Sequence, residues 1–113
     1  MEIGMEKEWL QLLEKLKPTL GKEANIDAIL FLIGIQELGQ GFKHFSKEEK
    51  QDLMHIGTCR VLSSSGYYSL EGTDQEGWPH WKLEKKLPAI SLKEQEDMLK
   101  MHIIEYFEKE NLF

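Results

Sequence analysis

Residues 26–38 of the chain read IDAILFLIGIQEL, and this stretch decides the fold. Aliphatic or aromatic side chains occupy most of its positions, so a helix here is apolar on nearly every side. Asn25 directly precedes the stretch and suits an N-cap, whose side chain accepts a hydrogen bond from a free N–H of the first turn. A helix that is apolar all round must be surrounded by protein. The sequence therefore predicts a helix over 25–38 that either lies at the centre of a bundle or forms the seam of a homodimer.

Three glycines indicate how this helix packs and where it stops. Gly34 costs about 1 kcal/mol of helix propensity relative to alanine, so its place inside the helix indicates a close crossing with another helix. Gly39 and Gly41 follow the apolar stretch and are typical helix stop signals.

The apolar run 28–35 is much shorter than the roughly 20 residues that span a bilayer, so we expect no membrane partner.

Three more helices are expected around this stretch. Residues 5–17 carry apolar side chains at helical spacing, and Pro18 disfavours a longer helix. Capping boxes begin at Ser46 and at Ser91, because in each case a glutamate follows three residues later and the two side chains can bond each other's free amides. We expect a mainly α fold, a compact four-helix bundle-like domain over 1–113. Its predicted helices are 5–17, 25–38, 47–64 and 92–109.

The segment 66–90 interrupts this helical pattern. It has no helical period, and so long a loop in a compact domain is usually either functional or not truly a loop. Tyr68 and Leu70 alternate with polar residues as in a strand, and so do Trp81 and Leu83. The segment is therefore either a long aromatic loop or a short β-hairpin between the third and fourth helices. A lone hairpin is marginal and has to lean on the helices.

Composition restricts the classes of partner and compartment. The formal net charge is −6, with 20 acidic and 14 basic side chains, so the basic surface that binds nucleic acids is missing. The single cysteine, Cys59, cannot form an internal disulfide, which is typical of a reducing compartment. The first residues are acidic where a signal peptide is basic. We expect a soluble, acidic, cytoplasmic protein.

Aromatic side chains crowd the 66–90 segment and make it the first candidate site. They stand close to several acids, so they can bind a cationic or planar ligand or anchor a protein partner. They can equally serve to pin an irregular segment against the helices. Arg60, the only arginine, is added as a possible anion contact or as a salt-bridge partner of the acidic segment that follows it. The candidate binding residues are Arg60, Tyr67, Tyr68, Trp78, His80 and Trp81.

Two helical pairs have the spacing of metal ligands. Asp52 and His55 stand one turn apart on the third predicted helix, and His102 and Glu105 do so on the fourth. Helical proteins that hold paired metals add further glutamates from other helices, and Glu37 is the only suitable one here. Because such spacings arise easily in an acidic chain, these four residues are a weaker hypothesis, and no cofactor is expected.

His55 also stands four residues before Cys59, a spacing that could activate a thiol. Cys59 lies in the middle of a predicted helix, away from the amide-rich helix N-terminus that lowers a thiol pKa. A buried structural cysteine is therefore expected, and no convergent catalytic set is visible in the sequence.

These features favour a non-enzymatic protein–protein interaction module that self-associates as a homodimer or binds a partner through the aromatic segment. The alternative is a small-ligand- or metal-binding protein. Its site would lie between the 66–90 segment and the third and fourth helices, with histidines or tryptophans converging on a pocket.

Overall fold

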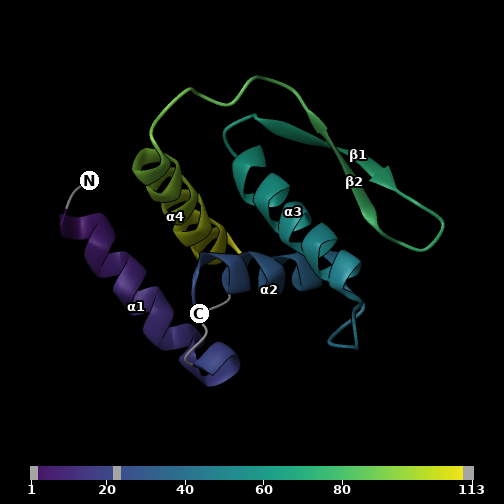
Figure 1. Cartoon of the computed structure of the whole chain (residues 1–113), viewed down its shortest axis with the longest axis horizontal. Coiled ribbons are helices and arrows are strands. Elements are labelled where there is room, and N and C mark those ends of the chain that lie inside the picture. The colour runs from purple at the N-terminus through teal and green to yellow at the C-terminus, as the bar shows by residue number, and fades with distance from the viewer. Residues whose placement is uncertain (1–2, 22–23, 111–113) are drawn as a thin grey trace.

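The computed structural model of the chain describes residues 3–21 and 24–110. Over these residues the chain forms four helices and one antiparallel hairpin, placed between the third and fourth helices (Figure 1). The predicted mainly α fold is confirmed, and the 66–90 segment contains a hairpin. The elements are α1 (Ile3–Leu20), α2 (Ile26–Leu38), α3 (Lys47–Ser63), β1 (Tyr68–Thr73), β2 (Pro79–Leu83) and α4 (Leu92–Lys109).

The predicted helix boundaries are close to the observed ones, with the largest error in α1. This helix continues through Pro18 to Leu20, whereas the sequence predicted its end at Lys17. Pro18 and its neighbours Lys17 and Thr19 are exposed, so water can bond the carbonyl that the proline leaves without an N–H partner. The three other N-caps are as predicted. Asn25 accepts from the Ala28 amide at 2.8 Å, and both capping boxes form.

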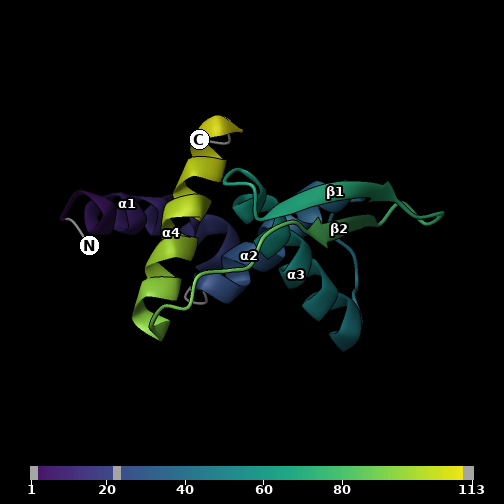
Figure 2. The same cartoon turned by 90° about the horizontal axis from the view of Figure 1, so that it is seen from above.

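α2 lies at the centre of the molecule. Figures 1 and 2 show α1 and α4 at one end and the hairpin, packed along α3, at the other. Ile29 and Ile33 of α2 are at most 1% exposed, and the exposed residues of this helix are the polar Asp27 and Gln36. Of the two predicted environments for the apolar helix, the central position is therefore the observed one.

The core consists of two hydrophobic clusters that share α2. The larger cluster joins α2 to α1, α3 and α4, and the smaller one joins the end of α2 to Phe45 and α3. Leu16 of α1, Leu62 of α3 and Ile103 of α4 are almost completely buried in the larger cluster. Because α2 contributes to both clusters, most of its apolar side chains are covered by its own chain, whereas Phe31 and Leu32 are covered only in part.

Gly34 and Gly57 bring α2 and α3 into backbone contact. A Cβ atom on Gly34 would lie 2.1 Å from the carbonyl oxygen of Leu53, and one on Gly57 would lie 2.2 Å from the carbonyl oxygen of Leu30. Neither position has room for any side chain. The close crossing predicted from Gly34 is confirmed, and Gly57 is its counterpart on α3.

The hairpin is bulged and tightly closed. Leu70 pairs with Trp81 but Gly72 pairs with His80, so Glu71 is an extra residue on β1. In the connecting loop the Asp74 carboxylate accepts hydrogen bonds from the amides of Glu76 and Trp78, at 2.9 and 3.0 Å. These bonds fix the conformation of the loop in which Trp78 packs against Phe45.

No helix within residues 3–21 and 24–110 is both long and apolar enough to cross a membrane.

Candidate functional site

The hairpin presents an apolar face that α3 covers only in part. Side chains alternate across a strand, and the pairs Tyr68–Leu83 and Leu70–Trp81 therefore point to the same face. Tyr68 and Trp81 are half-buried, whereas Leu70 and Leu83 are 54% and 53% exposed. Large apolar side chains thus remain uncovered beside the tryptophan of β2.

An open groove of about 290 Å³ runs between this hairpin and α3. Its walls combine two indole rings, two imidazoles and one carboxylate, contributed by α3 and by the start of β2. We call it the aromatic groove, and its lining residues are Asp52, His55, Ile56, Trp78, Pro79, His80 and Trp81.

The two tryptophans are held in different ways. The ring of Trp78 packs edge-on against Phe45 with 6.4 Å between centroids, so this side chain joins the loop to the smaller core cluster. The indole nitrogen of Trp81 is buried and has no hydrogen-bond partner among the described residues. A buried donor without an acceptor costs free energy. Trp78 therefore pins the hairpin, as one of the two predicted roles requires, while Trp81 carries an unsatisfied N–H beside the groove.

The polar groups of the groove differ in how strongly they are engaged. His80 Nε2 lies 3.0 Å from Asp74 Oδ2, and His55 Nε2 lies 3.4 Å from Cys59 Sγ. The hydrogen bond from His80, helped by the amide of Trp78, lowers the pKa of the Asp74 carboxyl. Asp52 is exposed and makes no hydrogen bond or ion pair within the described part of the chain, so its charge is available to a partner.

Cys59 has the environment of a structural cysteine. Its side chain is fully buried, and this burial raises the thiol pKa from 9.0 to about 11. At neutral pH the group is therefore a thiol, not a thiolate nucleophile. The contact between His55 and Cys59 that their spacing indicated does form, but it does not activate the sulfur.

The second predicted metal pair lies elsewhere. His102 is buried between α3 and α4, where Nδ1 donates to the Met98 carbonyl and Nε2 accepts from the Ser65 hydroxyl, both at 2.7 Å. Glu105 pairs with Lys109 at 3.5 Å. The hydrogen bonds to Met98 and Ser65 occupy both ring nitrogens of His102. His102 and Glu105 are not grouped with Asp52 and His55 into one site. Within residues 3–21 and 24–110, no three His, Cys, Asp or Glu side chains are grouped to hold a metal.

Arg60 lies away from the hairpin, in a polar cluster between three helices. Its guanidinium contacts Glu37 at 3.1 Å and Glu110 at 3.2 Å and lies over the Tyr106 ring. The Tyr106 hydroxyl donates to the same Glu37 carboxylate at 2.9 Å. Of the two alternatives for Arg60, the salt bridge to the acidic 66–90 segment is not formed. The last turn of α3 instead directs the guanidinium toward Glu37 of α2 and Glu110 at the end of α4.

Tyr67 and Tyr68 lie at the edge of the site. Tyr67 packs on the larger core cluster, and the Lys85 ammonium lies 4.6 Å from the centre of its ring. Tyr68 meets His55 edge-on at 6.2 Å, so it supports one wall of the aromatic groove. Of the predicted binding residues, Trp78, His80 and Trp81 are the ones that line the groove, and Asp52 and His55 join them.

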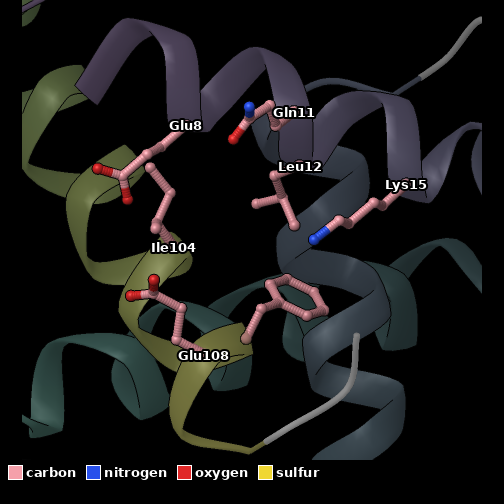
Figure 3. Close-up of a pocket in the computed structure, with 7 residues that line it drawn as sticks. Glu8, Gln11, Leu12, Lys15, Ile104 and Glu108 are labelled. Carbon is pink, nitrogen blue, oxygen red and sulfur yellow. The ribbon is translucent and has the colours of Figure 1, made fainter. Parts of the chain in front are cut away.

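A second groove, between α1 and α4, had no counterpart in the sequence predictions. Figure 3 shows its narrow half, of about 140 Å³, with Glu8 and Glu108 on opposite helices. A wider half of about 420 Å³ adjoins it and shares Glu8, Ile104 and Glu108. The spacing of Glu8, Gln11, Leu12 and Lys15 on one helical stripe was the only signal in the sequence. We call the two halves together the α1/α4 groove; they are lined by Gly4, Met5, Glu8, Gln11, Leu12, Lys15, Met101, Ile104, Glu105, Phe107 and Glu108.

Comparisons with known proteins identify no relative from which a function could be transferred. No model of a known protein family matches the chain. No curated protein and no solved structure is significantly similar to it. The chemistry of the two grooves is therefore the basis on which a function is inferred.

Proposed function

We propose that this chain is a non-enzymatic interaction module that binds a protein partner through the aromatic groove and the adjoining face of the hairpin. The exposure of Leu70 and Leu83 carries this proposal. Both leucines share a strand face with Trp81, so they extend the groove into an apolar surface. Interfaces are enriched in aromatic anchors at their centre, and Trp78 and Trp81 supply them here.

The charges around this surface favour a partner with basic side chains. Asp52 in the groove and Glu71 on the β1 bulge are exposed, and neither has a hydrogen-bond or salt-bridge partner among the described residues. A lysine or arginine can approach these carboxylates and lie over an indole ring. The partner that fits therefore has apolar side chains that contact Leu70 and Leu83 and at least one lysine or arginine.

The size of the groove supports a protein partner over a small molecule. Its volume of about 290 Å³ is just below the roughly 300–1,000 Å³ range of ligand pockets, and the groove is open to solvent. The groove is lined by aromatic rings, imidazoles and one carboxylate, groups that suit contacts with apolar and cationic side chains of a partner.

Self-association stays a prediction, but α2 can supply only a small part of its surface. The all-round apolar helix was the reason to expect a homodimer seam, and its own chain covers most of α2 but leaves Leu32 half-buried at an open pocket that the exposed Phe42 also lines. A second copy could use the hairpin face instead. Light scattering of the purified protein tests this directly, since a dimer would double the measured mass.

The experiment that tests the proposal uses a photo-reactive phenylalanine analogue at position 70. The matched control carries it at Leu10, which is 59% exposed on α1. We expect a protein adduct in the native host at position 70 and none at position 10. The captured partner is then purified, and its Kd for the chain is measured by calorimetry.

Variants of the groove complete this test. Leu83→Lys and Trp78→Ala should each raise the Kd by more than about tenfold, or about 1.4 kcal/mol, because they remove an apolar anchor. Leu83 is exposed, so its substitution leaves the fold intact even where Trp78→Ala unfolds the hairpin. An adduct that forms equally at both positions, or an affinity unchanged by Leu83→Lys, contradicts the proposal. If native mass spectrometry finds a small molecule bound to the chain and no protein partner, the aromatic groove is a small-ligand site.

A further inference from the structure

Helices α1 and α4, which line the α1/α4 groove, lie at the end of the molecule opposite the hairpin (Figures 1 and 2). Its floor is apolar and consists of Leu12, Ile104 and Phe107 in the narrow half and of Met5 and Met101 in the wider half. Met101 is 45% exposed. Methionine adapts its shape to different partners, so it is well suited to a binding surface.

Two carboxylates flank this floor. Glu8 on α1 and Glu108 on α4 are exposed and line both halves of the groove. In Figure 3 they lie at the same end of the hollow, on either side of Ile104, while Lys15 lies toward the other end. Neither glutamate has a hydrogen-bond or salt-bridge partner for its side chain among the described residues. A cation that enters this end of the groove would be attracted by both carboxylates.

The groove consists of two halves of different size. The narrow half holds about 140 Å³, which is room for single side chains, whereas the wider half of about 420 Å³ is within the roughly 300–1,000 Å³ of ligand pockets. The wider half follows it along the same helix pair. Successive anchor positions in one groove are the arrangement that receives residues i, i+3, i+4 and i+7 of an amphipathic helix.

We propose that the α1/α4 groove binds an amphipathic helix of a partner protein, whose apolar stripe enters the floor and whose lysine or arginine contacts Glu8 and Glu108. This surface is separate from the aromatic groove, so a negative result for one groove does not affect the proposal for the other. The net charge of −6 also favours the approach of a basic helix, although the specific contact is with the two glutamates.

A synthetic peptide of about 14 residues, close to four helical turns, serves as the probe. Leucines occupy positions i, i+3, i+4 and i+7, and lysines occupy the rest. Fluorescence anisotropy of the labelled peptide should show saturable 1:1 binding to the full chain, weakening as salt increases. A peptide with glutamate in place of lysine should not bind. If the lysine peptide shows no saturable binding, the proposal is wrong.

Charge reversal on α1 distinguishes the groove from general attraction to an acidic protein. Glu8→Lys and the matched control Glu14→Lys change the net charge equally and lie on the same helix, but Glu14 does not line the groove. We expect Glu8→Lys to raise the Kd of the lysine peptide at least about tenfold and Glu14→Lys to change it by less than about twofold. Equal effects of the two variants would overturn the proposal.

A second copy of the chain is the competing occupant. Sedimentation equilibrium should find a monomer, or a dimer whose stability Glu8→Lys does not change. A dimer that Glu8→Lys dissociates while Glu14→Lys leaves it intact would assign the groove to self-association and overturn the partner-helix proposal. Circular dichroism confirms that both variants remain helical.

Discussion

Gly34 on α2 lies against the backbone of Leu53 on α3, so closely that a Cβ atom would be 2.1 Å from the Leu53 carbonyl oxygen. Gly57 on α3 meets Leu30 on α2 in the same way, at 2.2 Å. The two helices thus cross with their backbones in contact at both positions. This crossing fixes the position of α3, and through α3 that of the hairpin and the aromatic groove.

Gly34→Ala should destabilise the fold although alanine is the better helix former. The propensity gain of about 1 kcal/mol is smaller than the cost of forcing two helices apart, about 1–3 kcal/mol or more. Urea unfolding of the variant measures the difference. Gly4→Ala is the matched control, because its Cβ would meet nothing within 4 Å. A variant at Gly34 as stable as the one at Gly4 would show that the crossing is not rigid.

Tyr106→Phe should lower the free energy of unfolding by about 1 kcal/mol, because it removes the hydroxyl that donates to Glu37 at 2.9 Å. The ring, which lies under the Arg60 guanidinium, is kept. Tyr67→Phe is the control, since the structure gives the Tyr67 hydroxyl no hydrogen bond among the described residues. Equal stability of both variants and the parent chain would mean that the bond to Glu37 contributes nothing net.

The stability of the chain should fall as the pH rises from 9 to 11, and Cys59 should account for part of this loss. Burial raises the pKa of its thiol from 9.0 to about 11. Over this range the unfolded chain releases a proton that the folded chain keeps, so unfolding is favoured as pH rises. Burial also raises the pKa of Tyr106, which acts in the same direction above about pH 10.

Cys59→Ala separates these contributions. The variant loses packing and is less stable at pH 7, but its stability should decline less steeply between pH 9 and 10 than that of the parent chain. Urea unfolding at several pH values gives both slopes. Identical slopes would show that the thiol titrates alike in the folded and unfolded chains.

The pKa of Asp74 should lie below its usual value of 3.8, since His80 and two loop amides donate to the carboxylate. The stability that this loop gains is present above pH 3.8 and is lost as the pH falls through the lowered pKa. Carbon-detected NMR titration measures that pKa. In His80→Ala it should move back toward 3.8, and an unchanged value would show that the imidazole does not hold the carboxylate.

Local features of the fold were predictable because their interactions join residues close together in the sequence. The capping boxes at Ser46 and Ser91 form between residues three positions apart, and the predicted helix starts were correct there. Alternation at Tyr68, Leu70 and Trp81 likewise indicated strands before any pairing was known. Pro18 misled the prediction because its cost depends on the solvent exposure of the turn around it.

The functional surfaces were predictable only in part. Trp78, His80 and Trp81 were grouped as candidate binding residues, and they line one groove because a hairpin brings residues close in sequence to one face. Their role in binding stays a prediction. The contacts of Arg60 and His102 were not predictable because their partners, Glu37 and Ser65, come from distant segments. The functions proposed for these two residues stay predictions. The α1/α4 groove joins residues about 100 positions apart, such as Glu8 and Glu108, and no local sequence pattern predicts that they lie in one groove.

By itself, the sequence left the 66–90 segment open between a long loop and a short hairpin, but it determined the mainly α class, the beginnings of three helices and the need to bury residues 26–38. Hydrogen bonds within one turn and the period of apolar residues specify these features. Only the tertiary structure decided that α2 is buried by its own chain, at a crossing that glycines allow. That choice depends on whether distant side chains fill the space around the helix, and packing of this kind is a property of the whole folded chain.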